Sequence, residues 1–256
     1  MWKYGFASVG GTFHLKSSTP CQDASRVEVF VDAVGAEVLI AVASDGAGSA
    51  TLAQLGSTLA CDMFIDDVKS RIEGGDAGSL LSDNFIADWI VKFRRLAFGW
   101  SHDKGVGIQD LACTLLAAVV WSDRVVYFQI GDGAIVESRR DEPDRYTVAC
   151  WPQQGEYANM TNFLTDADAA EKVVREARSG AIDELAIFTD GIQRLALDYR
   201  ARSAHGPFFA PLFAWLRPRL GGYSRELSDS LSVYLNSEKI NSRTDDDKTL
   251  ILATRR

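Results

Sequence analysis

The stretch Val38-Leu39-Ile40-Ala41-Val42-Ala43, followed directly by Ser44-Asp45-Gly46, decides the fold class of this chain. Six consecutive apolar residues predict a strand covered on both faces, because a strand with one solvent face alternates apolar and polar residues. A second buried strand is predicted at Glu184 to Phe188, and it ends at Thr189-Asp190-Gly191. Strands of this kind belong in the interior of a layered fold.

The rest of the chain supplies strands at both ends and helices between them. Amphipathic spacing predicts two helices, one carrying Leu52 to Phe64 and one carrying Phe85 to Leu96, which form an antiparallel pair on a sheet. We therefore expect an α+β fold, a four-layer α-β-β-α sandwich of two mainly antiparallel sheets flanked by helices. Further strands are expected at residues 4–9, 26–31 and 249–253, and further helices at 168–179, 208–216 and 223–235.

Four strand patterns in the middle of the chain predict one antiparallel meander, with turns at Ser122-Asp123 and Gly131-Asp132-Gly133. They cover residues 114–121, 125–130, 134–138 and 146–149. The less regular stretch that follows suggests a flap at about 152–180. No linker interrupts the pattern, so we expect a single domain over residues 1–256.

Composition excludes several classes of function. The net charge of −8 argues against nucleic acid and anionic lipid as partners, because both are themselves negative. Four scattered cysteines without a C-x-x-C pair indicate free thiols in a reducing compartment. The longest apolar stretch, residues 111–121, is too short to span a bilayer, and no signal peptide begins the chain. We therefore expect a cytoplasmic protein with no membrane contact.

The candidate functional residues are aspartates at the ends of strands. Asp23, Asp45, Asp190 and the run Asp245-Asp246-Asp247 offer the oxygen ligands that Mg²⁺ and Mn²⁺ prefer. An isolated Asp-Gly pair is more often a turn. However, Asp45 and Asp190 each end an apolar strand, where burial disfavours a carboxylate that has no partner. Two buried carboxylates predict a bound cation.

Five motifs carry a family resemblance when they are taken in order. They are Cys21-Gln22-Asp23-Ala24, Ala43-Ser44-Asp45-Gly46-Ala47-Gly48, Ile130-Gly131-Asp132-Gly133, Phe188-Thr189-Asp190-Gly191 and Asp245-Asp246-Asp247-Lys248-Thr249. Their order and spacing, over nearly the whole chain, resemble those of the type-2C (PPM) metal-dependent protein serine/threonine phosphatases. Thr114, before an apolar strand, also resembles the family's threonine motif, and residues 159–165 fall where the family has its flap.

The resemblance implies two Mn²⁺ or Mg²⁺ ions and a hydroxide that bridges them as the nucleophile for phosphoserine and phosphothreonine. By that resemblance Asp45 bridges both metals and the Gly46 carbonyl completes the first site. Asp190 and Asp246 hold the second metal, and Asp23 binds through water. The implied partners are a phosphoprotein substrate and a serine/threonine kinase that acts on shared substrates.

Several positions depart from the family pattern. Ser18 stands where many members place a phosphate-binding arginine, and Ala47 stands where some carry a histidine. Asp132 could help to hold a third metal, but Arg194 replaces its usual partner aspartate, and a plain hairpin turn at Asp132 explains the same residues equally well. Arg194 could instead balance charge near a substrate.

Two further interpretations complete the sequence analysis. The chain could be a catalytically weak, phosphatase-fold regulatory or phosphoprotein-binding module, because the arginine is missing at Ser18. Four carboxylates that converge without a cation would repel one another, and this favours catalysis. The histidines His14, His102 and His205 lie in no recognisable catalytic motif, so none is given a role.

Overall fold

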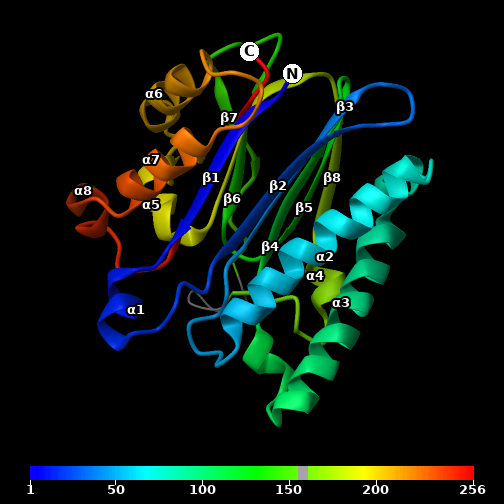
Figure 1. Ribbon diagram of the computed structural model, residues 1–256, viewed down its shortest axis with the longest axis vertical. Coiled ribbons are helices and arrows are strands. Elements are labelled where there is room, and N and C mark those ends of the chain that lie inside the picture. The colour runs from blue at the N-terminus through cyan, green and yellow to red at the C-terminus, as the bar shows by residue number, and fades with distance from the viewer. Residues whose placement is uncertain (155–160) are drawn as a thin grey trace.

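Two sheets lie face to face at the centre of the computed structural model, which describes residues 1–154 and 161–256 (Figure 1). The six-stranded sheet contains, in order across it, β12 (Gly222–Tyr223), β1 (Lys3–Val9), β13 (Lys248–Thr254), β9 (Ile182–Phe188), β6 (Ala134–Arg139) and β7 (Tyr146–Cys150). The five-stranded sheet contains β2 (Ala24–Val31), β3 (Glu37–Ser44), β4 (Leu115–Val120), β5 (Arg124–Ile130) and β8 (Val174–Ser179). Within these two sheets β1 and β12 pair in parallel, and the other neighbouring strands are antiparallel.

Helices cover the outer face of each sheet (Figure 1). The five-stranded sheet carries α2 (Ala53–Glu73) and α3 (Asp83–Lys104), and the six-stranded sheet carries α6 (Gly206–Leu216) and α7 (Arg225–Leu235). The predicted four-layer α-β-β-α sandwich is therefore confirmed. The shorter elements are α1 (Thr12–Ser17), η1 (Ala77–Leu81), η2 (Ile108–Leu111), α4 (Ala169–Lys172), η3 (Asp190–Ile192), α5 (Gln193–Ala196), α8 (Glu238–Asn241) and the ribbon of β10 (Leu197–Asp198) with β11 (Ser203–Ala204).

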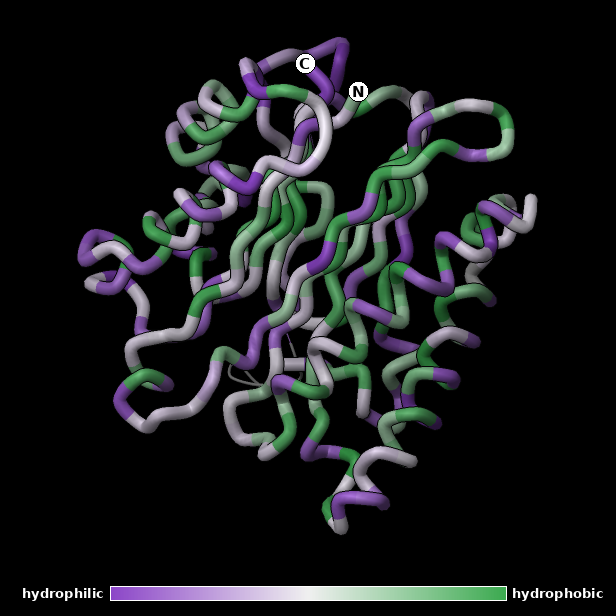
Figure 2. Tube along the Cα trace, in the orientation of Figure 1, coloured by the Kyte–Doolittle hydropathy of each residue, from purple (hydrophilic) through white to green (hydrophobic). Residues whose placement is uncertain are grey.

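The apolar run of β3 is explained by its place between two cores. Ile40 and Val42 belong to the core under α2 and α3, whereas Leu39 and Ala41 belong to the core between the sheets. Successive side chains of a strand point to opposite faces, so a strand with a core on each side needs apolar residues at every position. Figure 2 shows the result as largely hydrophobic colouring on the central strands, whereas the outer helices alternate between hydrophobic and hydrophilic colouring.

The predicted meander is wrong at one turn. The strands β4 and β5 form a hairpin in the five-stranded sheet, but β6 and β7 form theirs in the other sheet. The chain crosses between the sheets at Gly131-Asp132-Gly133, where Gly131 has a φ of 114°. Local turn chemistry is the same in a hairpin and in a crossing, so the sequence did not separate them.

The predicted helix at 168–179 is also wrong. Only residues 169–172 are helical, and Val174–Ser179 form the edge strand β8, which pairs with β5. The Glu, Ala and Arg content of this stretch favours a helix, but pairing with an open sheet edge overrides so weak a local preference. Part of the flap expected at about 152–180 lies outside the described residues.

The long helices α2 and α3 contain 21 and 22 residues. Charged side chains occupy their outer faces, among them Asp62 and Asp66 on α2 and Lys92 on α3. In the part of the chain that the structure describes, no helix combines the length and the apolar character needed to cross a bilayer.

Candidate metal centre

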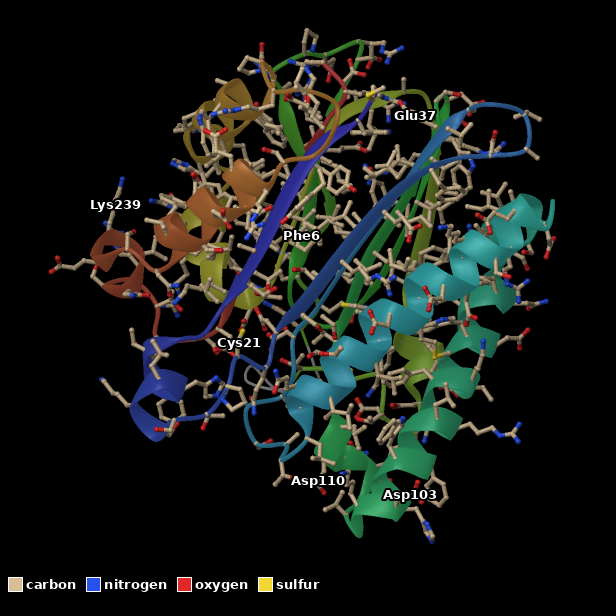
Figure 3. The ribbon with its side chains drawn as sticks, in the orientation of Figure 1. Phe6, Cys21, Glu37, Asp103, Asp110 and Lys239 are labelled. Atoms are coloured by element: carbon tan, nitrogen blue, oxygen red, sulfur yellow. The ribbon has the colours of Figure 1, made fainter. Side chains whose placement is uncertain are left out.

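The five predicted aspartates lie at the same end of the two sheets, at connections into or out of strands. Asp23 precedes β2 and Asp45 follows β3, and these strands are antiparallel neighbours. Asp132 joins β5 to β6, Asp190 follows β9, and Asp246 precedes β13. Figure 3 labels Cys21, two residues before Asp23, at this lower end, opposite Glu37 at the start of β3. Both sheets therefore contribute carboxylates to one place.

Three of these aspartates form a compact group. One carboxylate oxygen from each of Asp45, Asp132 and Asp190 lies within 4.8 Å of the other two. Asp132 Oδ2 also accepts a hydrogen bond of 2.6 Å from the Thr161 hydroxyl, and its carbonyl accepts one from the Gln193 amide. The plain hairpin interpretation of Asp132 is wrong, because β5 and β6 are not paired and its side chain faces the acidic group.

Two hydrogen bonds to Thr114 hold the backbone of Asp45 in place. Its N–H donates to Thr114 Oγ1 over 2.9 Å, and its carbonyl accepts from the Thr114 N–H over 2.8 Å. Gly46 follows in a space too small for any side chain, since a Cβ there would lie 2.7 Å from the Gln22 carbonyl oxygen and 2.8 Å from that of Ala53. The Thr114 and Gly46 positions thus fix the backbone on which the Asp45 carboxylate stands.

Asp23 is buried behind the group of three. Its Oδ2 accepts a hydrogen bond of 2.7 Å from the Thr189 hydroxyl, which in turn accepts one from the Thr249 N–H. The other oxygen, Oδ1, is buried and has no hydrogen-bond partner among the described residues, and the same is true of Asp190 Oδ1. Buried carboxylate oxygens without a donor are unusual, and they offer free ligand positions for a cation.

The pKa values of these carboxyl groups are raised. Burial, followed by the charges of neighbouring aspartates, raises the pKa of Asp23 to about 8 and that of Asp190 to about 7. The pKa of Asp45 lies well above its ordinary value, again through burial first and then through the charges of Asp23 and Asp190. Burial also raises the pKa of Asp246. The charged form of each carboxyl group is therefore disfavoured in this protein unless a positive charge lies beside it.

A cavity of about 310 Å³ opens beside Asp190 and Asp246. Arg194 and Arg243 also line it, together with Gly191, Gln193, Leu195, Thr244 and Asp245. Asp246 lies outside the compact group of three, but its charge contributes to the raised pKa of both Asp45 and Asp190. The acidic cluster therefore has an opening that is wide enough for a small anionic group to approach.

Comparison with known proteins assigns the family. Residues 10–232 match the model of the family described as Protein phosphatase 2C. The chain is 35% identical over 252 residues to Serine/threonine-protein phosphatase 3 of Escherichia coli (strain K12), with 98% of each protein covered. The chain belongs to the protein phosphatase 2C family. It is a serine/threonine protein phosphatase of a metal-dependent family, which confirms the resemblance found in the sequence.

Solved structures support the same fold. The crystal structure of a bacterial serine phosphatase matches this phosphatase with a TM-score of 0.62 and 16% identity, over 100% of this chain and 98% of the other. The structure of RsbX in complex with magnesium matches with a TM-score of 0.56 and 14% identity, over 99% and 94%. At such identities the likeness concerns the fold, and the magnesium belongs to RsbX.

Two positions that depart from the family pattern, Ser18 and Ala47, carry uncharged side chains in this phosphatase. Ser18 ends α1 with a φ of 55° and has an exposed side chain, as does Lys16. Ala47 is buried in a small apolar cluster with Ala50, Ala53 and Ala112. Lys16, on α1, is the one cationic side chain among these three residues, and it is exposed.

One buried pair in the phosphatase, His14 with Asp247, could not be recognised from sequence patterns. Asp247 is only 3% exposed, and its carboxylate accepts hydrogen bonds of 2.6 Å from the N–H groups of both Gly11 and Gln22. His14 Nδ1 lies 2.9 Å from Asp247 Oδ1. His14 lies in no recognisable catalytic motif, and its partner is 233 residues away in the sequence. This pair joins α1 and the approach to Asp23 to the turn that carries Asp246.

The metal-free phosphatase is expected to lose stability as the pH rises from about 4 to about 8. The raised pKa values mean that the folded state holds protons on Asp23 and Asp190 that the unfolded state has already released. This stabilisation is complete below the unfolded pKa near 4 and is lost as the pH passes the folded pKa values. Thermal melts in chelator at pH 5 to 8 measure it, and Mg²⁺ should reverse the loss.

The variant Asp190→Asn serves as the control for this pH dependence. It removes one of the shifted groups, so its metal-free melting temperature should change less with pH than that of the wild type. Equal pH dependence in the two proteins would contradict the assignment of the effect to the acidic cluster.

Proposed function

We propose that this phosphatase hydrolyses phosphoserine and phosphothreonine side chains of proteins with water activated on two Mg²⁺ or Mn²⁺ ions. The observation that carries the proposal is the group Asp45, Asp132 and Asp190, whose ligand oxygens lie within 4.8 Å of one another. Asp190 also lines the cavity of about 310 Å³. The unpartnered oxygens of Asp23 and Asp190 and the raised pKa values support it, because a cation would relieve both.

The residues have separable tasks in this proposal. Asp45 and the Gly46 carbonyl would help to hold one ion, Asp190 and Asp246 would help to hold the other, and Asp23 would contribute through water. Bound divalent ions lower the pKa of water and neutralise charge on phosphoryl oxygens. Thr114 and Thr189 keep Asp45 and Asp23 in place through the hydrogen bonds described above.

Asp132 shares the compact group with Asp45 and Asp190, which supports a role in holding a cation there. Among the described residues, the structure offers no second group of three such side chains for a separate third ion. We therefore assign Asp132 to the common cluster. The phosphoprotein substrate implies a serine/threonine kinase that acts on the same proteins as the natural counterpart.

Phosphate release from a phosphothreonine peptide tests the proposed function. Purified protein would be measured with Mn²⁺, with Mg²⁺ and with chelator, beside the variants Asp190→Asn and Asp229→Asn. Turnover should require a metal, should fall by about 100-fold or more in Asp190→Asn, and should be unchanged in Asp229→Asn, which alters an exposed carboxylate on α7. Metal binding without turnover in the wild type would instead favour a phosphoprotein-binding module.

A further inference from the structure

Two arginines from different parts of the chain meet in the cavity beside the acidic cluster. Arg194 lies on α5, four residues after Asp190, and Arg243 follows α8, three residues before Asp246. Both line the cavity of about 310 Å³ together with these two aspartates. Figure 1 shows α5 and α8 on the same side of the molecule, where the chain leaves α8 toward β13.

The guanidinium groups of Arg194 and Arg243 have no partner among residues 1–154 and 161–256. Among the residues that the structure describes, no hydrogen bond or ion pair joins the side chain of Arg194 or Arg243 to another group, and both side chains are exposed. By contrast, Arg217 donates two hydrogen bonds to the buried Glu184, and Arg178 donates one to the buried Glu137. The two cavity arginines therefore remain available to a ligand.

The position of these arginines restricts the ligand to an anion. A guanidinium group beside bound divalent ions would be repelled unless an anion lay between them. The planar fork of arginine donates two parallel hydrogen bonds to phosphate oxygens, and it keeps its charge throughout the working pH range. A phosphoryl group that entered this cavity would lie near Asp190 and Asp246, which would hold a metal ion, and near the guanidinium groups of Arg194 and Arg243.

The surrounding contacts hold α5 in position for this task. The Gln193 side chain donates to the Asp132 carbonyl and accepts from the Tyr199 hydroxyl, so the residue before Arg194 is tied to the acidic group itself. Gly191 packs against the Asp247 carbonyl so closely that a Cβ there would lie 1.9 Å from the oxygen. The close contact between Gly191 and Asp247 thereby joins the segment that carries Arg194 to the segment that carries Arg243.

We propose that Arg194 and Arg243 bind the phosphoryl group of the substrate. They supply the cation that is absent at Ser18, from the opposite end of the sequence and from a different segment of the site. This inference rests on the proposed function, because it concerns the same catalytic cluster. It makes both arginines substrate-binding residues of the phosphatase and leaves the metal ligands unchanged.

Steady-state kinetics and phosphate binding test the inference. Arg194→Ala and Arg243→Ala would be compared with Arg225→Ala, which removes the same charge from an exposed site on α7. With Mn²⁺ present, each cavity variant should raise KM for a phosphothreonine peptide and for p-nitrophenyl phosphate by about 10- to 100-fold, and weaken binding of inorganic phosphate in calorimetry by a similar factor. Arg194→Lys should fall between the wild type and the alanine variant.

Several outcomes would overturn the inference while the proposed function stands. One is metal-dependent turnover in the wild type with cavity variants that match Arg225→Ala. Another is a defect confined to peptides with acidic flanking residues, which would place the arginines against the peptide and not the phosphoryl group. A loss of Mn²⁺ affinity or of melting temperature in both variants would show a structural role. Absence of metal-dependent turnover in the wild type would instead reject the proposed function.

Discussion

Replacing Asp45 by asparagine is expected to reduce phosphatase activity by about 1,000-fold while making the metal-free protein more stable. Asp45 stands in the compact group with Asp132 and Asp190, and its carboxylate has the charges of Asp23 and Asp190 as neighbours. Asparagine keeps the shape but loses the negative charge that would hold a cation in the proposed mechanism, and losses of this size follow removal of a group that stabilises the transition state. Phosphate release with saturating Mn²⁺ measures the first effect.

The gain in stability has the same cause as the loss of activity. Without metal, the buried carboxylate of Asp45 is disfavoured by desolvation and by like charges, so its removal relieves both. A domain of this size gains roughly 2–4 °C in melting temperature for each kcal/mol. We expect Asp45→Asn to melt above the wild type in chelator and to respond less to added Mg²⁺.

The exposed substitution Asp229→Asn is the control for both measurements, since it changes the net charge equally and should change neither result. An Asp45→Asn protein that melted at the wild-type temperature in chelator and kept its response to Mg²⁺ would show that Asp45 is not at the centre of the cation site.

Replacing Asp247 by alanine is expected to cost about 3 kcal/mol of folding free energy. Its carboxylate is the common acceptor for the N–H groups of Gly11 and Gln22 and lies beside His14, and all of these would lose their partner inside the protein. Buried donors left without acceptors carry the full cost of desolvation. The melting temperature should fall by roughly 6–12 °C, measured with metal absent.

The neighbouring variant Asp245→Ala controls for a general effect of this turn, because the Asp245 side chain is exposed. His14→Ala should destabilise the protein less than Asp247→Ala, and the double variant should be less unstable than the sum of the two. Metal affinity should also fall in Asp247→Ala, because Asp247 ties the turn of Asp246 to the chain that leads into Asp23. Additive effects of the two substitutions would contradict a direct interaction.

Much of the architecture could be read from local patterns. The apolar run of β3 and the stripes of α2 and α3 specify which faces are buried, and burial on both faces of β3 requires a layer on each side. Asp45 and Asp190 were recognisable because each follows a run of buried apolar residues, where burial disfavours a carboxylate that has no partner. Each of these patterns can be recognised within a short stretch of sequence.

The assignment of Asp132 shows where local patterns fail. The same Gly-Asp-Gly sequence serves a hairpin or a crossing between sheets, and only the partners of β5 and β6 decide between them. The strand β8 is a second example, since its sequence favours a helix and the open edge of β5 makes it a strand. In both cases the deciding contacts come from distant parts of the chain.

By itself the sequence determined the layered fold class, the family and the aspartates that end buried strands. The tertiary structure alone decided that Asp132 joins Asp45 and Asp190, that His14 pairs with Asp247, and that Arg194 and Arg243 share one cavity. The physical reason is the range of the interactions. Side-chain periodicity indicates which residues of a single strand or helix are buried. A functional site is made by contacts between distant segments, and these come together only when both sheets have formed.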